Sequence, residues 1–89
     1  MTVCKRVYYS GRVQGVGFRY TARRLAQGHP VSGYVRNLAD GRVELVAQGT
    51  AELVNAFLEA VARRMADYIE ETSVSDASPG DYSGFEIRH

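Results

Sequence analysis

The sequence contains a single cysteine, Cys4, and no uninterrupted apolar run near 18 residues. One cysteine cannot form an intramolecular disulfide or a cysteine-based zinc site, and it is typical of a reduced thiol in a cytoplasmic protein. Because the N-terminus lacks an apolar segment as well, neither a signal peptide nor a membrane span is predicted. We therefore expect a cytoplasmic protein that has no membrane partner.

The chain also has almost no excess of positive or negative charge. Eleven Lys and Arg side chains stand against ten Asp and Glu side chains, which leaves a net charge of +1. This balance argues against binding of a polyanion through bulk electrostatics, so we expect no nucleic-acid partner, and any bound anion should be small. With 89 residues, of which 45% are hydrophobic, the chain is expected to form one domain over residues 1–89.

The hydrophobic pattern alternates between the periods of strands and of helices. In residues 54–65 apolar side chains recur at i, i+3, i+4, i+7 and i+11, as in a helix that lies on a sheet. The dipeptide Asp40-Gly41 predicts a hairpin turn between two alternating segments. Strands are predicted at 3–10, 31–37, 42–48, 69–75 and 84–88, and helices at 18–28 and 50–65.

This order is β-α-β-β-α-β with one additional short strand. It predicts an α+β protein with the ferredoxin-like, split β-α-β arrangement, in which two helices cover one face of an antiparallel sheet.

The segment from Gly11 to Gly17, here called the glycine loop, separates the first strand from the first helix. Its spacing does not fit the P-loop, which needs a Lys-Ser or Lys-Thr pair after its last glycine. The dinucleotide-binding pattern starts with Gly15 and Gly17 but requires a third glycine where Tyr20 stands. Glycines before a helix do let backbone N–H groups converge on one anion, so a single phosphoryl or sulfate group fits the loop.

Arg19 lies in the first turn of the predicted helix, where the helix dipole disfavours a cation. Its guanidinium could hold phosphate oxygens through two parallel hydrogen bonds. The residues alone leave two interpretations open: anion binding, or a tight turn followed by a solvated arginine. Arg23 and Arg24 are expected to be solvated surface residues.

Two segments, "GRVQGVGFR" (11–19) and "GYVRNLADGRVE" (33–44), closely resemble the signature segments of the acylphosphatases. These small enzymes hydrolyse the carboxyl-phosphate bond of acyl phosphates. The ending "FEIRH" is similar to the last strand of the family, whereas "RMADYIEET" replaces a Gly-Pro turn that the family commonly has after its second helix.

The resemblance implies roles for individual residues. Arg19 matches the phosphate-binding arginine of the family, and Asn37 matches the asparagine that positions the attacking water. Without the resemblance, Asn37 is better explained as a residue that ends a strand before a turn. The phosphate-binding backbone N–H groups match the residues Gln14, Gly15, Val16, Gly17 and Phe18.

The expected activity is therefore acylphosphatase activity without a metal or other cofactor. Neither His29 nor His89 is placed as a convincing general base. None is needed for the leaving group, because a carboxylate, whose acid has a pKa near ~4, departs without a general acid. The proton of the water could pass to an oxygen of the substrate phosphate. We expect a monomer that binds a small acyl phosphate and is inhibited by its product, inorganic phosphate.

Alternatives remain on the same fold. One is a non-catalytic module that binds a small anion or RNA, although the aromatic RNA-binding signature of such sheets is absent. Similar segments also begin a hydrogenase-maturation protein that handles carbamoyl phosphate. Because no zinc-finger cysteines or further domain follow here, we expect a free-standing enzyme.

Overall fold

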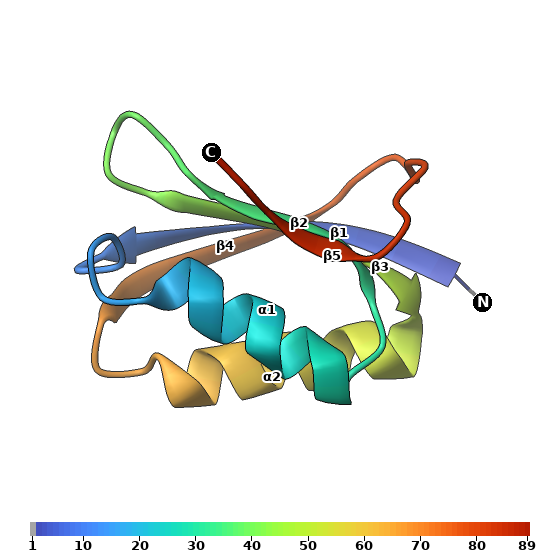
Figure 1. Ribbon diagram of the computed structural model, residues 1–89. Coiled ribbons are helices and arrows are strands. Elements are labelled where there is room, and N and C mark those ends of the chain that lie inside the picture. Colours follow the sequence, from blue (N-terminus) through green and yellow to red (C-terminus); the bar gives the residue numbers. More distant parts are fainter. Residues whose placement is uncertain (1) are drawn as a thin grey trace.

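A computed structural model describes residues 2–89, and five strands and two helices follow one another along the chain (Figure 1). The strands are β1 (Thr2–Gly11), β2 (Ser32–Asn37), β3 (Val43–Thr50), β4 (Ile69–Asp76) and β5 (Phe85–Arg88), and the helices are α1 (Phe18–Gly28) and α2 (Ala51–Arg64). The predicted element order is confirmed, including the additional short strand.

The strands form one sheet in the order β4-β1-β3-β2-β5, and both helices lie on the same face of it (Figure 1). The pairs of β1 with β4, β1 with β3 and β2 with β3 are antiparallel, as predicted, but β5 runs parallel to β2. The parallel pair arises because β4 and β5 lie at opposite edges, so the chain reverses while it crosses from one edge to the other. This crossing carries the end of the chain to the edge beside Asn37.

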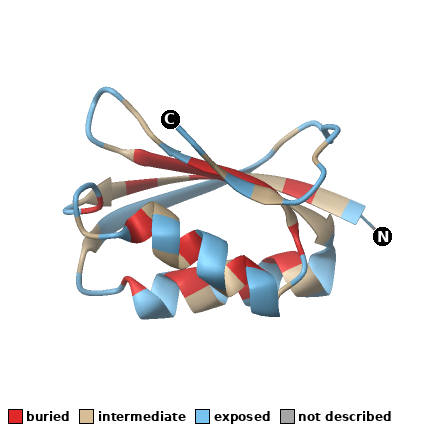
Figure 2. Cartoon of the chain, viewed as in Figure 1, coloured by how far each residue is buried: buried red, intermediate tan, exposed pale blue. Residues whose placement is uncertain are grey.

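The core lies between the sheet and the two helices, whose buried residues are marked on the ribbon (Figure 2). Helix α2 buries Val54, Phe57 and Val61, which confirms the predicted stripe, and Thr50 caps its start by accepting a hydrogen bond from the N–H of Leu53 at 3.3 Å. Helix α1 buries Phe18, Ala22 and Ala26. In the described part of the chain, neither helix has the length and apolar character that crossing a membrane requires.

The only cysteine faces the side of the sheet that the helices leave open. Cys4 is buried there beside Tyr34 and Val46 under the crossing segment, which contributes Tyr82. Burial raises the pKa of the Cys4 thiol, so the thiol stays protonated and unreactive at neutral pH. This agrees with the expectation of an ordinary reduced cysteine.

A carboxylate, Glu44, is buried near the middle of the same open face. Tyr8 and Tyr34 each donate a hydrogen bond to it at 3.0 Å, Arg36 donates one at 2.7 Å, and Arg6 lies 3.5 Å away. Burial alone would raise the pKa of Glu44, but the hydrogen bonds outweigh it and hold the pKa below its usual value. The network therefore stabilises the charged carboxylate in the folded protein.

Replacing Glu44 by glutamine should lower the free energy of unfolding at neutral pH by about 1–3 kcal/mol. The glutamine NH₂ group would face hydroxyl and guanidinium groups that themselves donate hydrogen bonds, so some of these donors would lose their acceptor. The lower end applies if solvent screens the partly exposed Arg6 and Arg36. Folding lowers the pKa of Glu44, so its stabilisation is complete above about pH 4.3 and is lost as the pH falls through the folded pKa. Urea unfolding of both proteins from pH 7 to pH 3 tests this: the difference should shrink in acid, and a constant difference would contradict it.

Candidate active site

The glycine loop leaves β1 through an irregular position in the sheet. Pairing of β1 with β4 shifts register between Ser10 and Gly11, and the N–H of Arg12 donates to the carbonyl of Tyr68 at 2.9 Å. Gly11 has a φ of +120°, and a Cβ there would lie 2.5 Å from the same carbonyl oxygen. The position therefore requires glycine, and it turns the chain away from the sheet toward α1.

The loop then presents its backbone donors to solvent. Gly15 and Gly17 both have left-handed backbones, with φ of 78° and 80°. Within residues 2–89, the N–H groups of Gln14, Gly15, Val16 and Gly17 have no hydrogen-bond acceptor. Unpaired N–H groups in left-handed turns before a helix are the arrangement that binds anions in proteins.

The first turn of α1 adds positive charge without any compensation. Gly17 occupies the N-cap and supplies no side-chain hydrogen bond, and the first turn holds no acidic residue. Arg19 is half-buried in this turn. Since a helix start ordinarily favours an acidic or hydroxyl side chain, the combination indicates that an external anion fills this role.

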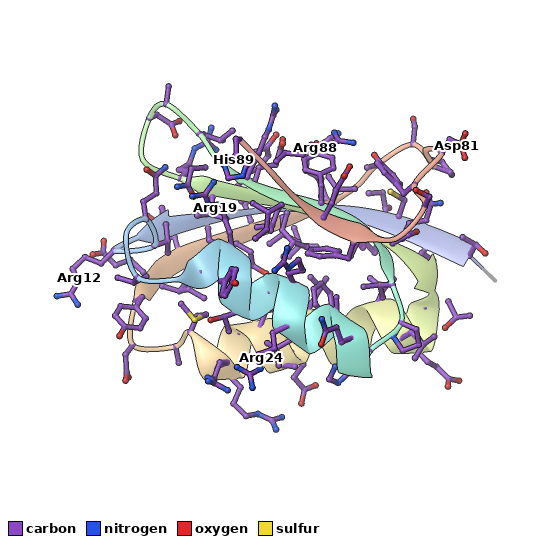
Figure 3. All side chains as sticks on the ribbon, in the orientation of Figure 1. Arg12, Arg19, Arg24, Asp81, Arg88 and His89 are labelled. Atoms are coloured by element: carbon purple, nitrogen blue, oxygen red, sulfur yellow. The ribbon has the colours of Figure 1, made fainter. Side chains whose placement is uncertain are left out.

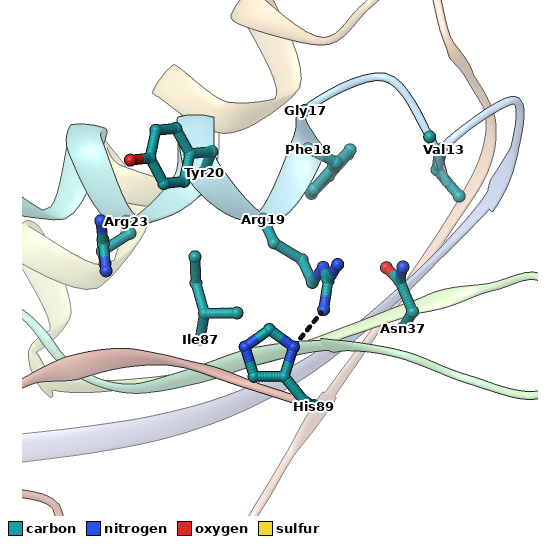
Figure 4. Close-up of a pocket in the computed structure, with 10 residues that line it drawn as sticks. Val13, Gly17, Phe18, Arg19, Tyr20, Arg23, Asn37, Ile87 and His89 are labelled. Carbon is teal, nitrogen blue, oxygen red and sulfur yellow. Dashed lines mark hydrogen bonds between the residues drawn. The ribbon is translucent and has the colours of Figure 1, made fainter.

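Arg19 and Asn37 come together in one cavity of about 370 Å³. Asn37 ends β2 on the same face as the buried Val35, and the two polar side chains point toward one another (Figure 4). The cavity is lined by Val13, Gly15, Gly17, Phe18, Arg19, Tyr20, Arg23, Asn37, Ile87 and His89. The structure thus joins the two residues singled out by the signature segments, which lie on different elements.

The other predicted residues face the cavity only in part. Gly15, Gly17 and Phe18 line it, but the Phe18 ring lies in the core, 4.9 Å from the ring of Tyr9. Val16 packs against the core, and Gln14 is not among the lining residues. Any anion-binding role of Gln14, Val16 and Phe18 therefore belongs to their backbone N–H groups.

The Gln14 side chain instead ties the glycine loop to the turn that follows Asn37. Its Nε2 donates to the carbonyl of Leu38 at 2.8 Å and to that of Arg42 at 3.0 Å. The turn itself closes through the N–H of Leu38, which donates to Arg42 at 2.8 Å, with Gly41 at a φ of 96° as the Asp-Gly pair predicts. Gln14 thereby holds the two halves of the site at a fixed separation.

His89 is a cavity residue that the sequence reasoning did not single out. Its Nδ1 lies 3.3 Å from Nη1 of Arg19, so the guanidinium donates to an unprotonated ring nitrogen (Figures 3 and 4). The signal was present in the alternation of the last strand, which places Phe85, Ile87 and His89 on one side. His29, by contrast, lies near the end of α1, with Nδ1 3.0 Å from the carbonyl of Leu25, and does not line the cavity.

Two further residues of α1 line the cavity, Tyr20 and Arg23. Arg23 is exposed, as predicted, but it also lines the cavity, whereas Arg24 does not. Tyr20 is 68% exposed on α1, and the Arg23 guanidinium lies 5.0 Å from the centre of its ring. The spacing i, i+4 from Arg19 could have indicated that Arg23 shares its face of the helix.

Candidate metal ligands do not gather in the described part of the chain: residues 2–89 contain no group of three or more His, Cys, Asp or Glu side chains that could hold an ion. The donors that converge at the cavity are backbone N–H groups, a guanidinium and an amide. This donor set suits a phosphate group, which carries negative charge and offers several acceptor oxygens.

Comparison with known proteins gives one consistent family. The profile of the acylphosphatase family matches residues 5–87. The chain is 40% identical over 86 residues to an acylphosphatase of Acaryochloris marina, covering 96% of this chain and 92% of that one. It is 39% identical to an acylphosphatase of Archaeoglobus fulgidus, covering 98% and 99% of the two chains.

Solved structures agree with the sequence comparison. The crystal structure of acylphosphatase from Bacillus subtilis superposes with a TM-score of 0.87 at 34% identity, and the match covers all of both chains. The similarity therefore extends over both helices and all five strands.

Proposed function

Because the chain belongs to the acylphosphatase family, we propose that its loop cavity is the site at which it hydrolyses the carboxyl-phosphate bond of acyl phosphates. The observation that carries this assignment is the pair of Arg19 and Asn37, which face one another in a cavity beside unpaired backbone N–H groups. A role in binding alone is not favoured, because the chain is similar over nearly its whole length to relatives named acylphosphatase.

The phosphoryl group is held by the glycine loop and Arg19. In a loose transition state, negative charge lies on the three peripheral phosphate oxygens, and catalysis consists mainly of holding them in place. The N–H groups of residues 14–18 and the Arg19 guanidinium supply donors that are already oriented, so they need not reorganise during the reaction. The positive end of α1 adds to the same field.

Asn37 positions the attacking water. A side-chain amide can accept a hydrogen bond from the water and donate one to a phosphate oxygen, which fixes the water relative to phosphorus. Such alignment lowers the barrier by converting an encounter with bulk water into a reaction within the complex. The position of Asn37 across the cavity from Arg19 suits this role (Figure 4).

No side chain acts as general base in this mechanism. His29 lies outside the cavity, and His89 uses Nδ1 to accept a hydrogen bond from Arg19. The proton of the water passes to an oxygen of the transferred phosphate, and the carboxylate leaves as an anion. The water oxygen forms a bond to phosphorus as the bond between phosphorus and the carboxylate oxygen breaks, so water and the acyl phosphate yield a carboxylate and inorganic phosphate.

Three further properties follow from this proposal. Inorganic phosphate, which fits the same donors as the substrate, is a competitive inhibitor. Arg19 and the backbone N–H groups neutralise the negative charge of the bound phosphate, so Mg²⁺ is dispensable. Residues 1–89 act as one monomeric domain in the cytoplasm, where the single thiol stays reduced.

Hydrolysis of benzoyl phosphate tests the proposal. We expect turnover well above the spontaneous rate, unchanged in excess EDTA, with inorganic phosphate raising KM and leaving kcat constant. Benzoate release, followed by absorbance, gives all three results in one assay. Turnover no faster than in buffer would reduce the site to anion binding, and loss of activity in EDTA would overturn metal independence.

Gln14→Ala should lower kcat for benzoyl phosphate about 5- to 30-fold, because two hydrogen bonds worth about 1–2 kcal/mol together no longer align loop and turn. The inhibition constant of phosphate should change far less, since the backbone donors remain. Gln48→Ala is the matched control: Gln48 also makes two hydrogen bonds, to Gly80 in the segment that crosses the open face, and its loss should leave kcat unchanged. Equal effects of the two variants would show that Gln14 has no special role.

A further inference from the structure

The cavity continues past the phosphate-binding groups along the surface of α1. Arg23 follows Arg19 by one helical turn, and both line the cavity together with Tyr20 and Ile87. In the close-up, the Arg19 guanidinium turns toward Asn37, while Arg23 lies on the other side of Ile87 and Tyr20 lies on α1 above Ile87 (Figure 4). The space therefore has two parts, with a cation in each.

Within residues 2–89 no carboxylate lies within 4 Å of the second cation, Arg23, and the same holds for Arg12, Arg19, Arg24 and Arg64. Of these five arginines, Arg19 and Arg23 line the cavity. The Arg23 guanidinium lies 5.0 Å from the ring centre of Tyr20. None of the residues that line the cavity is acidic. Arg23 is thus held at the cavity with its charge available to a ligand.

The phosphoryl group does not need this charge. It is served by Arg19 and by the N–H groups of the glycine loop, at the opposite side of Ile87 from Arg23. The part of an acyl phosphate that extends away from the phosphate is the acyl group. In this cavity it would cross the apolar Ile87 side chain before it reaches Arg23.

We propose that Arg23, supported by Tyr20, forms a subsite for a carboxylate on the acyl group, so that the preferred substrates are monoacyl phosphates of dicarboxylic acids. This inference rests on the proposed function of the loop cavity. A carboxylate is the occupant that fits, because one guanidinium offers two parallel N–H donors that match two coplanar oxygens. A second phosphate could accept the same two bonds, but it carries up to two negative charges against the single positive charge of Arg23, whereas a carboxylate carries one.

The placement of the two arginines on α1 guides the choice of acyl group. Residues 19 and 23 lie about 6 Å apart along the helix axis and their guanidinium groups diverge from there, so a rigid acyl group at least as long as a para-substituted benzene ring is needed to reach from one to the other. Benzoyl phosphate and 4-carboxybenzoyl phosphate are therefore a suitable pair of probes. They differ only in the carboxylate that would contact Arg23.

The experiment compares kcat/KM for these two substrates in the wild type, Arg23→Gln and Arg24→Gln. We expect the wild type to prefer 4-carboxybenzoyl phosphate, and the ratio of the two kcat/KM values to fall about tenfold in Arg23→Gln, as for a lost hydrogen-bonded ion pair near solvent. Arg24 neighbours Arg23 but lies outside the cavity, so Arg24→Gln should leave the ratio unchanged. This control separates a local contact from general attraction by the arginines of α1.

The outcomes distinguish this inference from the proposed function. If the wild type hydrolyses benzoyl phosphate but the ratio is unchanged in Arg23→Gln, the subsite is wrong and the active site stands. An equal fall of the ratio in both variants also overturns the subsite, because it would indicate long-range attraction. If the wild type hydrolyses neither substrate, the proposed function itself fails.

Discussion

Arg19→Ala is expected to lower kcat/KM for benzoyl phosphate about a thousandfold, which corresponds to about 4 kcal/mol of lost transition-state stabilisation. The loss is large because Arg19 is the only lining cation that points toward Asn37 in the cavity, so no neighbouring guanidinium takes its place (Figure 4). Phosphate in the ground state loses the same donor. The inhibition constant of inorganic phosphate should therefore rise together with the loss of rate.

The same substitution should not destabilise the protein. A cation in the first turn of α1 is unfavourable to the helix, so its removal should raise the free energy of unfolding slightly, by up to ~1 kcal/mol, or leave it unchanged. Circular dichroism and thermal unfolding measure this beside the kinetics. Arg24→Ala, on the same helix but outside the cavity, should keep full activity. An unfolded Arg19→Ala protein, or one with normal kcat/KM, would defeat the assignment.

Asn37→Ala is expected to lower kcat a hundredfold to a thousandfold, since the water loses the group that aligns it with phosphorus. Unlike the arginine variant, it should weaken the binding of inorganic phosphate only a few-fold, because it loses one neutral hydrogen bond while Arg19 and the backbone donors are intact. The two variants thus separate into one that loses both phosphate binding and rate and one that loses mainly rate. Initial-rate kinetics with phosphate as inhibitor measure both quantities.

Asn55→Ala is the matched control for this variant, because Asn55 is exposed on α2 and does not line the cavity. It should behave as the wild type. No hydrogen bond of the Asn37 side chain is found within residues 2–89, so its removal should leave the melting temperature within a few degrees. A normal kcat in Asn37→Ala would remove Asn37 from the mechanism.

The glycine loop shows why part of the site could be predicted from the sequence. The left-handed backbones at Gly15 and Gly17 and the arginine at an uncapped helix start depend on neighbouring residues alone. A bound anion can therefore be predicted there without knowledge of the fold. Asn37 differs, because its type and its position before a turn fit an ordinary strand end. Only the resemblance of its segment to the family implied a role for it.

Residues brought in from distant segments were harder to predict. Nothing local to Gln14 indicates that its amide meets carbonyls of Leu38 and Arg42, since that contact depends on how loop and turn are packed together. His89 reaches Arg19 only because β5 pairs with β2 in parallel, against the antiparallel arrangement expected of the sheet. Both contacts depend on tertiary structure rather than on local pattern.

Arg23 represents a third case. Arg23 was predicted to be a solvated surface residue, and the structure confirms its exposure. Exposure and participation in a site are not alternatives, however, because a cavity open to solvent is lined by exposed side chains. The prediction was incomplete because it treated a charged helix face as a single surface, whereas Arg23 lines the cavity and Arg24 does not.

The parallel pairing of β5 has a consequence for the order of folding. β5 is the last strand in the chain and has one neighbour in the sheet, β2. Ile87 and His89 come with it, and until they arrive the glycine loop faces open water. With four residues β5 is also the shortest strand, so few hydrogen bonds hold it to the sheet. We expect catalytic competence to appear after the bulk of the secondary structure, as the last event of folding.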